Sequence, residues 1–201
     1  MIKTIIFDIG NVLAEFGWQP YFASFGYDSE TLAKLGKATV LSPDWNEYDL
    51  GNLSDEDILK LFIENDPSIE KQLRETLTNY SAILKRYDYA IPWIKELHAR
   101  GFQVLFLSNF SEKALRECAS VLDFVPYTDG GIFSCKVHLT KPDPAIYKLL
   151  LSTYHIKAEE CVFLDDTLAN INAAEALGIH GIHFKNQAQA ISELEAIINR
   201  E

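Results

Sequence analysis

Three segments of the sequence end an apolar run in polar side chains of the kinds that bind metal ions and react with phosphate groups. Asp8 follows the first run, Ser108 and Asn109 end the second, and Asp165 and Asp166 end the third. Carboxylates brought together repel one another unless a cation lies between them, and oxygen ligands without clustered His or Cys suit Mg²⁺. Magnesium bound in this way keeps positions open for water and phosphate oxygens. The sequence therefore predicts a magnesium and phosphate site, provided that the three segments converge.

A cation and a glycine accompany these polar residues. Lys141, in a loop before the third segment, supplies a compact ammonium that can hold a phosphate or balance a nucleophilic carboxylate. Gly10 lets the backbone turn sharply or approach a ligand closely just after Asp8. Each residue alone has an ordinary structural explanation, since Asp8 and Ser108 are also common turn residues and a lysine is usually a surface charge. Their occurrence together at strand ends favours the functional interpretation.

The pattern of apolar residues predicts the elements that bring these side chains together. Buried strands are expected at residues 2–7, 102–107, 132–133, 161–164 and 179–184, and from about residue 89 they alternate with helices. Alternation of this kind predicts an α/β fold with a doubly wound, Rossmann-like parallel sheet. Because the carboxyl ends of parallel strands lie along one edge of a sheet, the polar residues are expected to meet there.

Residues 15–88 differ from the rest of the chain, because they contain several short helical patterns and no convincing strand. Ser54 is expected to cap one helix and Pro67 to begin another. Aromatic residues early in this stretch are expected to form its core, although one could line a substrate pocket: Trp18, Tyr21, Phe22 and Phe25. The predicted organisation is an α/β core of residues 1–14 and 89–201, with a small helical cap of residues 15–88 inserted after the first strand.

Composition limits the classes of partner. The chain has 201 residues and a formal net charge of −11, which argues against binding nucleic acid or an anionic membrane surface. Its three cysteines contain no C-x-x-C pair and predict reduced thiols in a reducing compartment. With no signal-peptide pattern and no apolar run long enough to span a membrane, a cytoplasmic location is expected. The oligomeric state is left open.

In their order along the chain, these motifs resemble the four motifs of the haloacid dehalogenase-like hydrolases. The matching segments are Asp8-Ile-Gly-Asn-Val-Leu, Leu-Ser108-Asn109, Lys141-Pro142-Asp143-Pro144, and Phe-Leu-Asp165-Asp166 followed by Asn170. The match covers nearly the whole chain and puts the insert where this family has a helical cap. The resemblance implies a core sheet of flavodoxin-like winding, and a phosphatase is the commonest activity among relatives with such a cap.

The resemblance also implies roles in phosphoryl transfer. Asp8 would be the nucleophile that takes the phosphoryl group as an aspartyl-phosphate, which water later hydrolyses. Ser108 would donate a hydrogen bond to a phosphoryl oxygen, and Asn109 would reach the substrate. Lys141 would tie the phosphate to the nucleophile.

The same resemblance implies a magnesium site. Mg²⁺ would be held by Asp8, the backbone carbonyl of Gly10, and Asp166, with Asp165 as a further acid of the site, either close to the metal or behind its ligands. Asn170 is either a partner that orients Asp166 or an ordinary helix residue. His180 and His183 have H-x-x-H spacing, but on a strand they point to opposite faces and are not expected to bind a metal.

One position departs from the family pattern. Phosphatases of this family usually carry a second Asp two residues after the nucleophile, as general acid and then base, and this chain has Gly10 there. Proton transfer of that kind contributes roughly 10²- to 10⁴-fold in rate. Glu15, Asp44 and Glu47 are candidates to replace it, and the sequence does not select one. Related sequences with a Gly-Asn loop of this type resemble sugar-phosphate phosphatases.

Three hypotheses follow for the function. The first is a Mg²⁺-dependent phosphomonoester hydrolase acting on a small phosphorylated metabolite, a sugar phosphate or similar. The second is a 2-haloacid dehalogenase, in which Asp8 attacks carbon without a metal; the adjacent acids Asp165 and Asp166 weigh against it. The third, motivated by Gly10, is a phosphate-binding or regulatory protein that kept the fold and lost turnover.

Overall fold

A five-stranded, entirely parallel sheet forms the centre of the structure, a computed structural model that describes residues 1–199. Its strands are β1 (Thr4–Phe7), β4 (Gln103–Ser108), β5 (Gly130–Phe133), β6 (Cys161–Asp165) and β7 (His180–His183). All residues of β1 and β6 are buried, as expected for strands with helices on both faces. The predicted α/β fold with a doubly wound parallel sheet is confirmed.

The order of the strands corrects one expectation. The sheet runs β5-β4-β1-β6-β7, which is the Rossmann order and differs from flavodoxin-like winding. The difference arises because β5 pairs with β4, so the chain crosses to the other side of β1 only after its third core strand. The direction of winding therefore reverses between β1 and β6. In open α/β sheets, ligands bind beyond the strand ends at such a reversal.

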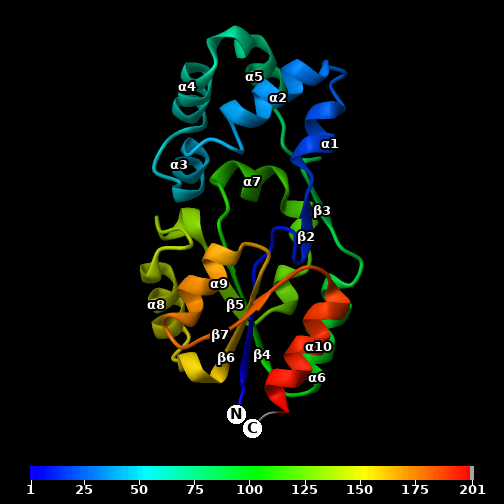
Figure 1. The fold of residues 1–201 in the computed structure, drawn as a ribbon, viewed down its shortest axis with the longest axis vertical. Helices are drawn as coiled ribbons and strands as arrows, with labels where there is room; N and C mark the ends of the chain where they lie inside the picture. The colour runs from blue at the N-terminus through cyan, green and yellow to red at the C-terminus, as the bar shows by residue number, and fades with distance from the viewer. Residues whose placement is uncertain (200–201) are drawn as a thin grey trace.

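Helices cover both faces of the sheet (Figure 1). The helices α6 (Ala90–Ala99) and α10 (Gln187–Ile198) lie on one face, and α8 (Pro144–Thr153) and α9 (Leu168–Glu175) lie on the other. Side chains alternate along β1, so that Ile5 and Phe7 pack toward the first pair whereas Ile6 packs toward the second. The site at the sheet edge is thus held by a core buried from both sides.

Asp143 and Pro144 begin α8, because the side chain of Asp143 accepts a hydrogen bond from the backbone N–H of Ala145. Ser111 likewise caps α7 (Glu112–Glu117), which follows β4. Short 3₁₀ turns complete the connections: η1 (Pro67–Ile69), η2 (Ala119–Leu122), η3 (Val125–Tyr127), η4 (Ser134–Lys136) and η5 (Ala158–Glu160).

The inserted segment carries a group of helices above the carboxyl edge of the sheet (Figure 1). These are α1 (Trp18–Ala23), α2 (Ser29–Ala38), α3 (Asp44–Leu50), α4 (Asp55–Asn65) and α5 (Glu70–Thr76). Ser54 caps α4 as predicted, whereas Pro67 begins η1, which leads into α5. The expectation that this stretch holds no strand is wrong, because β2 (Ala14–Phe16) and β3 (Leu84–Arg86) form an antiparallel pair where the insert leaves and rejoins the sheet.

Each of those two strands has three residues, too few for an alternating pattern to be recognised in the sequence. The aromatic residues at the start of the insert pack in its core: Tyr21 and Phe22 are buried, and Trp18 and Phe25 pack against them. The division into a core and a cap domain stays a prediction.

The three cysteines, Cys118, Cys135 and Cys161, are buried free thiols, as the sequence predicts. Among residues 1–199, no helix combines the length and the apolar character needed to cross a membrane.

Candidate active site

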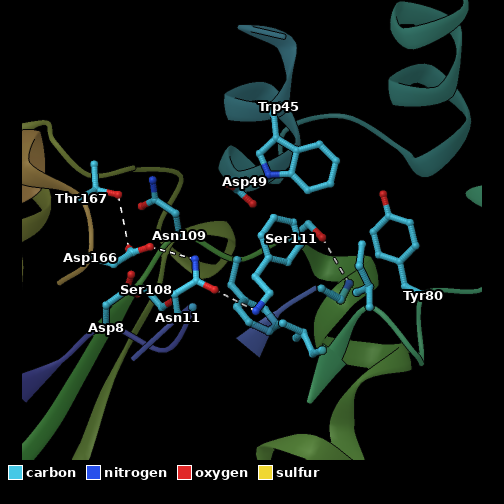
Figure 2. A pocket seen from close by; sticks show the side chains of 16 residues that line it. Asp8, Asn11, Trp45, Asp49, Tyr80, Ser108, Asn109, Ser111, Asp166 and Thr167 are labelled. Carbon is cyan, nitrogen blue, oxygen red and sulfur yellow. Dashed lines mark hydrogen bonds between the residues drawn. The ribbon is translucent and has the colours of Figure 1, made fainter. Parts of the chain in front are cut away.

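The polar residues at the strand ends converge on one cavity, as the parallel sheet predicts. Asp8 directly follows β1, Ser108 ends β4, and Asp166 follows β6; all three line a cavity of about 220 Å³ between the sheet edge and the inserted helices (Figure 2). Asn109 and Gly10 line it as well. The side chain of Ser108 is almost fully buried and makes no hydrogen bond within residues 1–199, which leaves its hydroxyl available to a ligand.

Lys141 lies beneath the cavity and joins two of the acids. Its Nζ atom is 2.9 Å from Oδ1 of Asp8 and 2.7 Å from Oδ2 of Asp165, and the side chain is only 1% exposed. Asn109 fixes the backbone of Lys141 through two hydrogen bonds: its Nδ2 donates to the lysine carbonyl at 2.9 Å, and its Oδ1 accepts from the lysine N–H at 2.8 Å. The predicted contact between Lys141 and the nucleophile position is therefore present.

Burial and neighbouring charges change the pKa values of Asp8 and Lys141. Burial raises the pKa of the Asp8 carboxyl to about 7, because the attraction of Lys141 only partly offsets the loss of water and the charge of Asp165 adds to the rise. Burial alone would lower the pKa of Lys141, but the two carboxylates outweigh it and raise that pKa above its usual value. The ammonium therefore stays charged, and Asp8 gains from any further positive charge nearby.

The site also has room for such a charge. Oxygens of Asp8, Asp165 and Asp166 lie within 4.8 Å of one another, and among residues 1–199 the only ammonium paired with them is that of Lys141. Within residues 1–199, Oδ2 of Asp8 and the carbonyl of Gly10 accept no hydrogen bond. Three carboxylates with one ammonium leave an excess of two negative charges, and the free donors are oxygens. This set fits a divalent, oxygen-preferring cation such as Mg²⁺.

The two acids after β6 have different surroundings. Both oxygens of Asp165 accept hydrogen bonds from Nδ2 of Asn170, at 3.0 Å each, and Oδ1 also accepts from the N–H of Thr167. Asp166 is half-buried and accepts a hydrogen bond from Nδ2 of Asn11 at 2.8 Å. The idea that Asn170 orients Asp166 is wrong, since the helix turns its amide toward Asp165. Asp166 has the more open position toward the cavity.

Asn11 is a site residue that the sequence reasoning missed. Its Oδ1 accepts from the backbone N–H of Phe16 at 3.0 Å, so its side chain joins the start of the insert to Asp166. The histidines of the H-x-x-H pattern take no place in the carboxylate cluster. Instead, the ring of His183 contacts the backbone carbonyl of Asp166 at 2.9 Å and supports the loop from behind.

The opposite wall of the cavity is apolar and comes largely from the insert. Its members are Phe16, Trp45, Tyr80, Ile83, Leu84, Phe110 and Ala114. The aromatic residues at positions 18–25 are not among them, because they are used in the core of the insert. No Lys, Arg or His occurs among the described residues that line the cavity.

One further acid reaches the cavity from the insert. Asp49, near the end of α3, lines the cavity and is only 9% exposed. Glu15, Asp44 and Glu47, the acids considered from the sequence, do not line it. Residues two apart on a helix do not share a face, so Glu47 turns away where Asp49 turns in. No motif in the sequence marks Asp49.

Comparison with known proteins identifies a family. The profile of the family described as "Hydrolase: haloacid dehalogenase-like hydrolase" matches residues 2–178. This range contains every residue of the carboxylate cluster, together with Ser108, Lys141 and the inserted helices.

Several relatives match along almost the whole chain. The chain is 24% identical over 196 residues to the sesquiterpene phosphatase astK of Aspergillus oryzae, covering 98% of this chain and 96% of the relative. It is 25% identical over 213 residues to the D-ribitol-5-phosphate phosphatase of Bacteroides thetaiotaomicron, covering 99% of this chain and 100% of the relative. The mouse acyl-CoA dehydrogenase family member 10 is 28% identical over 207 residues and 98% of this chain, but the match spans only 19% of that longer protein.

A solved structure shares the fold. A HAD family enzyme of Bacteroides thetaiotaomicron, in complex with magnesium and inorganic phosphate, superimposes with a TM-score of 0.70 at 20% identity, covering 92% of this chain and 95% of that one.

Proposed function

The chain belongs to the haloacid dehalogenase-like hydrolases, and we propose that it is a Mg²⁺-dependent phosphomonoester hydrolase with Asp8 as its nucleophile. One observation carries this proposal. Asp8 lies at the point where the sheet reverses, with Oδ1 held by Lys141 and the N–H of Ile9 and Oδ2 free within residues 1–199. A carboxylate held in this way is oriented on one side and open on the other, as an attacking group must be.

The proposed reaction has two steps. In the first, the Asp8 carboxylate attacks phosphorus, the bond from phosphorus to the alcohol oxygen breaks, and that oxygen takes a proton from an acid of the site. In the second, water attacks the phosphorus of the aspartyl-phosphate, which releases inorganic phosphate and restores the Asp8 carboxylate. Ser108 donates a hydrogen bond to a phosphoryl oxygen, and Lys141 favours the ionised form of Asp8 and holds its carboxylate in place.

The metal site belongs to the same proposal. Asp8, Asp166 and the carbonyl of Gly10 would hold Mg²⁺, and Asp165 would support the site through Lys141 and Asn170. When bound, Mg²⁺ neutralises the negative charge that gathers at the phosphate and the surrounding carboxylates. The magnesium in the structural neighbour from Bacteroides thetaiotaomicron supports this assignment.

The cavity limits the substrate. Its volume of about 220 Å³ is below the range of roughly 300–1,000 Å³ typical of pockets for drug-sized ligands, which favours a small ester. Because no cationic side chain from the described part of the chain lines it beside the three acids Asp8, Asp49 and Asp166, a second anionic group on the substrate would be repelled. We therefore propose a monophosphate of a small uncharged alcohol, with sugar or polyol phosphates as the first candidates. The names of the two full-length phosphatase relatives support the reaction class.

The same cavity weighs against the dehalogenase hypothesis. A 2-haloacid carries a carboxylate, and it would have to bind among acids with only the Lys141 ammonium, already paired to two of them, to attract it. A resident divalent cation would relieve that repulsion, but the dehalogenase hypothesis does not include one.

A panel of phosphate esters tests the proposal. Purified protein is incubated with 4-nitrophenyl phosphate, polyol phosphates and matched bisphosphates or phosphorylated acids, with Mg²⁺ or with a chelator, and released phosphate is measured. Turnover of the monophosphates that requires Mg²⁺ and disappears in Asp8→Asn is expected. Activity that survives Asp8→Asn would refute the role of Asp8, and halide release from 2-haloacids in the presence of chelator would favour the dehalogenase.

A different result would distinguish the third hypothesis, a phosphate-binding protein without turnover, from the proposed phosphatase. If the native protein binds phosphate and Mg²⁺ without turning over any ester, and Gly10→Asp creates turnover, then the chain is a binding protein that lost its catalytic acid. An added Cβ at Gly10 meets no heavy atom within 4 Å, so the substitution fits the site.

A further inference from the structure

The proposed reaction requires a proton donor for the leaving alcohol, and the family pattern that the sequence resembles would put it at position 10, where this chain has a glycine. Among residues 1–199, four ionisable side chains line the cavity: Asp8, Asp49, Tyr80 and Asp166. Asp8 is the proposed nucleophile and Asp166 a proposed metal ligand. Burial holds the pKa of Tyr80 well above its usual value, so its phenol is a poor source of protons near neutral pH. Asp49 is the remaining acid.

The backbone of Asp49 is fixed to the sheet side of the molecule. Oγ of Ser134, in η4, donates a hydrogen bond to the carbonyl of Asp49 at 2.7 Å and accepts one from the N–H of Phe110 at 2.8 Å. Gly51 packs so closely on the same turn that an added Cβ would lie 2.8 Å from Cβ of Cys135. The end of α3 is therefore docked beside the strand end that carries Ser108.

The side chain of Asp49 is free on the cavity side. Within residues 1–199 its carboxyl makes no hydrogen bond and no ion pair, although it is 9% exposed. Figure 2 shows it entering from α3, beside Trp45, while Asp8 and Asp166 enter from the sheet edge. A buried carboxyl without a partner is expensive to ionise, and burial raises the pKa of Asp49 to about 7, with Lys141 opposing the rise and Asp8 adding to it.

We propose that Asp49 is the catalytic acid that protonates the leaving alcohol, in place of the side chain missing at Gly10. This inference rests on the proposed function. In the first step the Asp49 proton moves to the alcohol oxygen as its bond to phosphorus breaks. In the second, the resulting Asp49 carboxylate takes a proton from the attacking water as its oxygen bonds to phosphorus, which restores the acid. Protons therefore balance over one cycle.

The role of an acid is separated from a structural role by the leaving group. Alkoxides need protonation to leave, whereas 4-nitrophenolate leaves without it. In Asp49→Asn, we expect the first-turnover rate with an alkyl or polyol phosphate to fall roughly 10²- to 10⁴-fold. The burst of 4-nitrophenolate in the first turnover of 4-nitrophenyl phosphate should fall less than about tenfold, followed by slow steady-state turnover because the base for water is also lost.

Two further variants complete the test. Glu47→Gln changes an acid of the same helix that does not line the cavity, and both rates should stay at the wild-type level. Gly10→Asp in the Asp49→Asn protein places a carboxyl two residues after Asp8, and it should restore the alkyl phosphate rate by at least tenfold.

Outcomes against the inference are distinct from outcomes against the proposed function. Equal losses with both esters in Asp49→Asn, or no loss with either, would refute the role of Asp49 and leave the nucleophile in place. Wild-type protein that turns over neither ester with Mg²⁺ would refute the proposed function, and this inference with it.

Discussion

The ammonium of Lys141 and the carboxylate of Asp8 form a buried ion pair, with Nζ and Oδ1 2.9 Å apart and side-chain exposures of 1% and 11%. Lys141 makes a second pair with Asp165, so one cation serves two acids that come from neighbouring strands. Removal of one partner from a buried pair leaves an uncompensated charge, which costs far more than the loss of a surface pair. The stability of the strand ends therefore depends on this lysine.

Lys141→Met is expected to lower the free energy of unfolding by roughly 3–5 kcal/mol at pH 8 in the presence of chelator. Asp8 and Asp165 then face each other without a cation, and phosphatase activity should fall at least about 100-fold because the nucleophile is no longer held. Urea denaturation and released phosphate measure the two effects.

Lys3→Met is the matched control for this prediction. Lys3 pairs with Glu160 at 2.7 Å, but its side chain is 61% exposed. Loss of an exposed pair should cost less than about 1 kcal/mol and leave activity unchanged. Equal destabilisation by the two substitutions would show that the buried Lys141 pair contributes no more to the free energy of unfolding than the exposed Lys3 pair.

Most of the sheet-edge site was predictable from the sequence because its residues end buried strands. The apolar runs before Asp8, Ser108 and Asp165 predict parallel strands, and parallel strands place their carboxyl ends together. The strand order was not predictable in this way, since the runs do not show whether β5 pairs with β4 or with β1. Pairing depends on crossover geometry, and there the flavodoxin-like expectation failed.

The residues that the insert contributes to the site could not be predicted from the sequence, for a similar reason. Asp49 is one acid among many in residues 15–88, and its place in the cavity depends on the docking of α3 against η4. That contact joins segments 85 residues apart and uses a backbone carbonyl, which leaves no side-chain pattern in the sequence. From the sequence alone, Glu47 was as plausible a cavity acid as Asp49, because only the structure shows which face of α3 turns toward the cavity.

Asp166→Asn is expected to separate two effects of the acidic cluster on stability: repulsion among its carboxylates and stabilisation by bound Mg²⁺. Without Mg²⁺, the variant should be more stable than the wild type, because one of three mutually repelling carboxylates is removed while the hydrogen bond from Asn11 can be kept. With Mg²⁺, the wild type should gain stability, about 2.7 kcal/mol at a concentration 100 times the dissociation constant, and the variant should gain little.

Thermal unfolding with and without Mg²⁺ measures this difference. Asp123→Asn, which changes an acid outside the cluster, should keep the full gain from the metal. The magnesium assignment would be wrong if Asp166→Asn and the wild type were stabilised equally.

The pH dependence of stability gives a test of Asp49 that is independent of activity. The pKa of the Asp49 carboxyl is about 7 in the folded protein, and that of an unperturbed Asp, as in the unfolded chain, is 3.8. Between these two pH values the folded state therefore binds more protons than the unfolded state. The contribution of Asp49 to stability therefore falls as pH rises from about 4 to about 7 and is constant above that. Asp49→Asn removes this dependence.

Relative to the wild type, Asp49→Asn should gain stability by roughly 4 kcal/mol between pH 4 and pH 8 in the presence of chelator. Urea denaturation at several pH values measures the difference between the two proteins, and Glu47→Gln serves as the control. A difference that does not change with pH would mean that Asp49 ionises freely in the folded protein.

Gly51→Ala is expected to disturb the docking of α3 and with it the reaction. Gly51 has φ +68°, and an added Cβ would lie 2.8 Å from Cβ and 3.0 Å from Cα of Cys135. Backbone strain of about 1–2 kcal/mol then adds to a clash with the turn that holds Asp49, so stability and the alkyl phosphate rate should both fall. Gly26 has φ +78°, and an added Cβ there meets no heavy atom within 4 Å.

Gly26→Ala therefore carries the same kind of backbone strain without the clash. It should lose about 1–2 kcal/mol and keep its rate with every ester. If the docked turn positions Asp49, the rate of Gly51→Ala should fall more with alkyl phosphates than with 4-nitrophenyl phosphate, because only the former need the acid. Equal behaviour of the two glycine variants would mean that the contact of Gly51 with Cys135 does not control the geometry of the site.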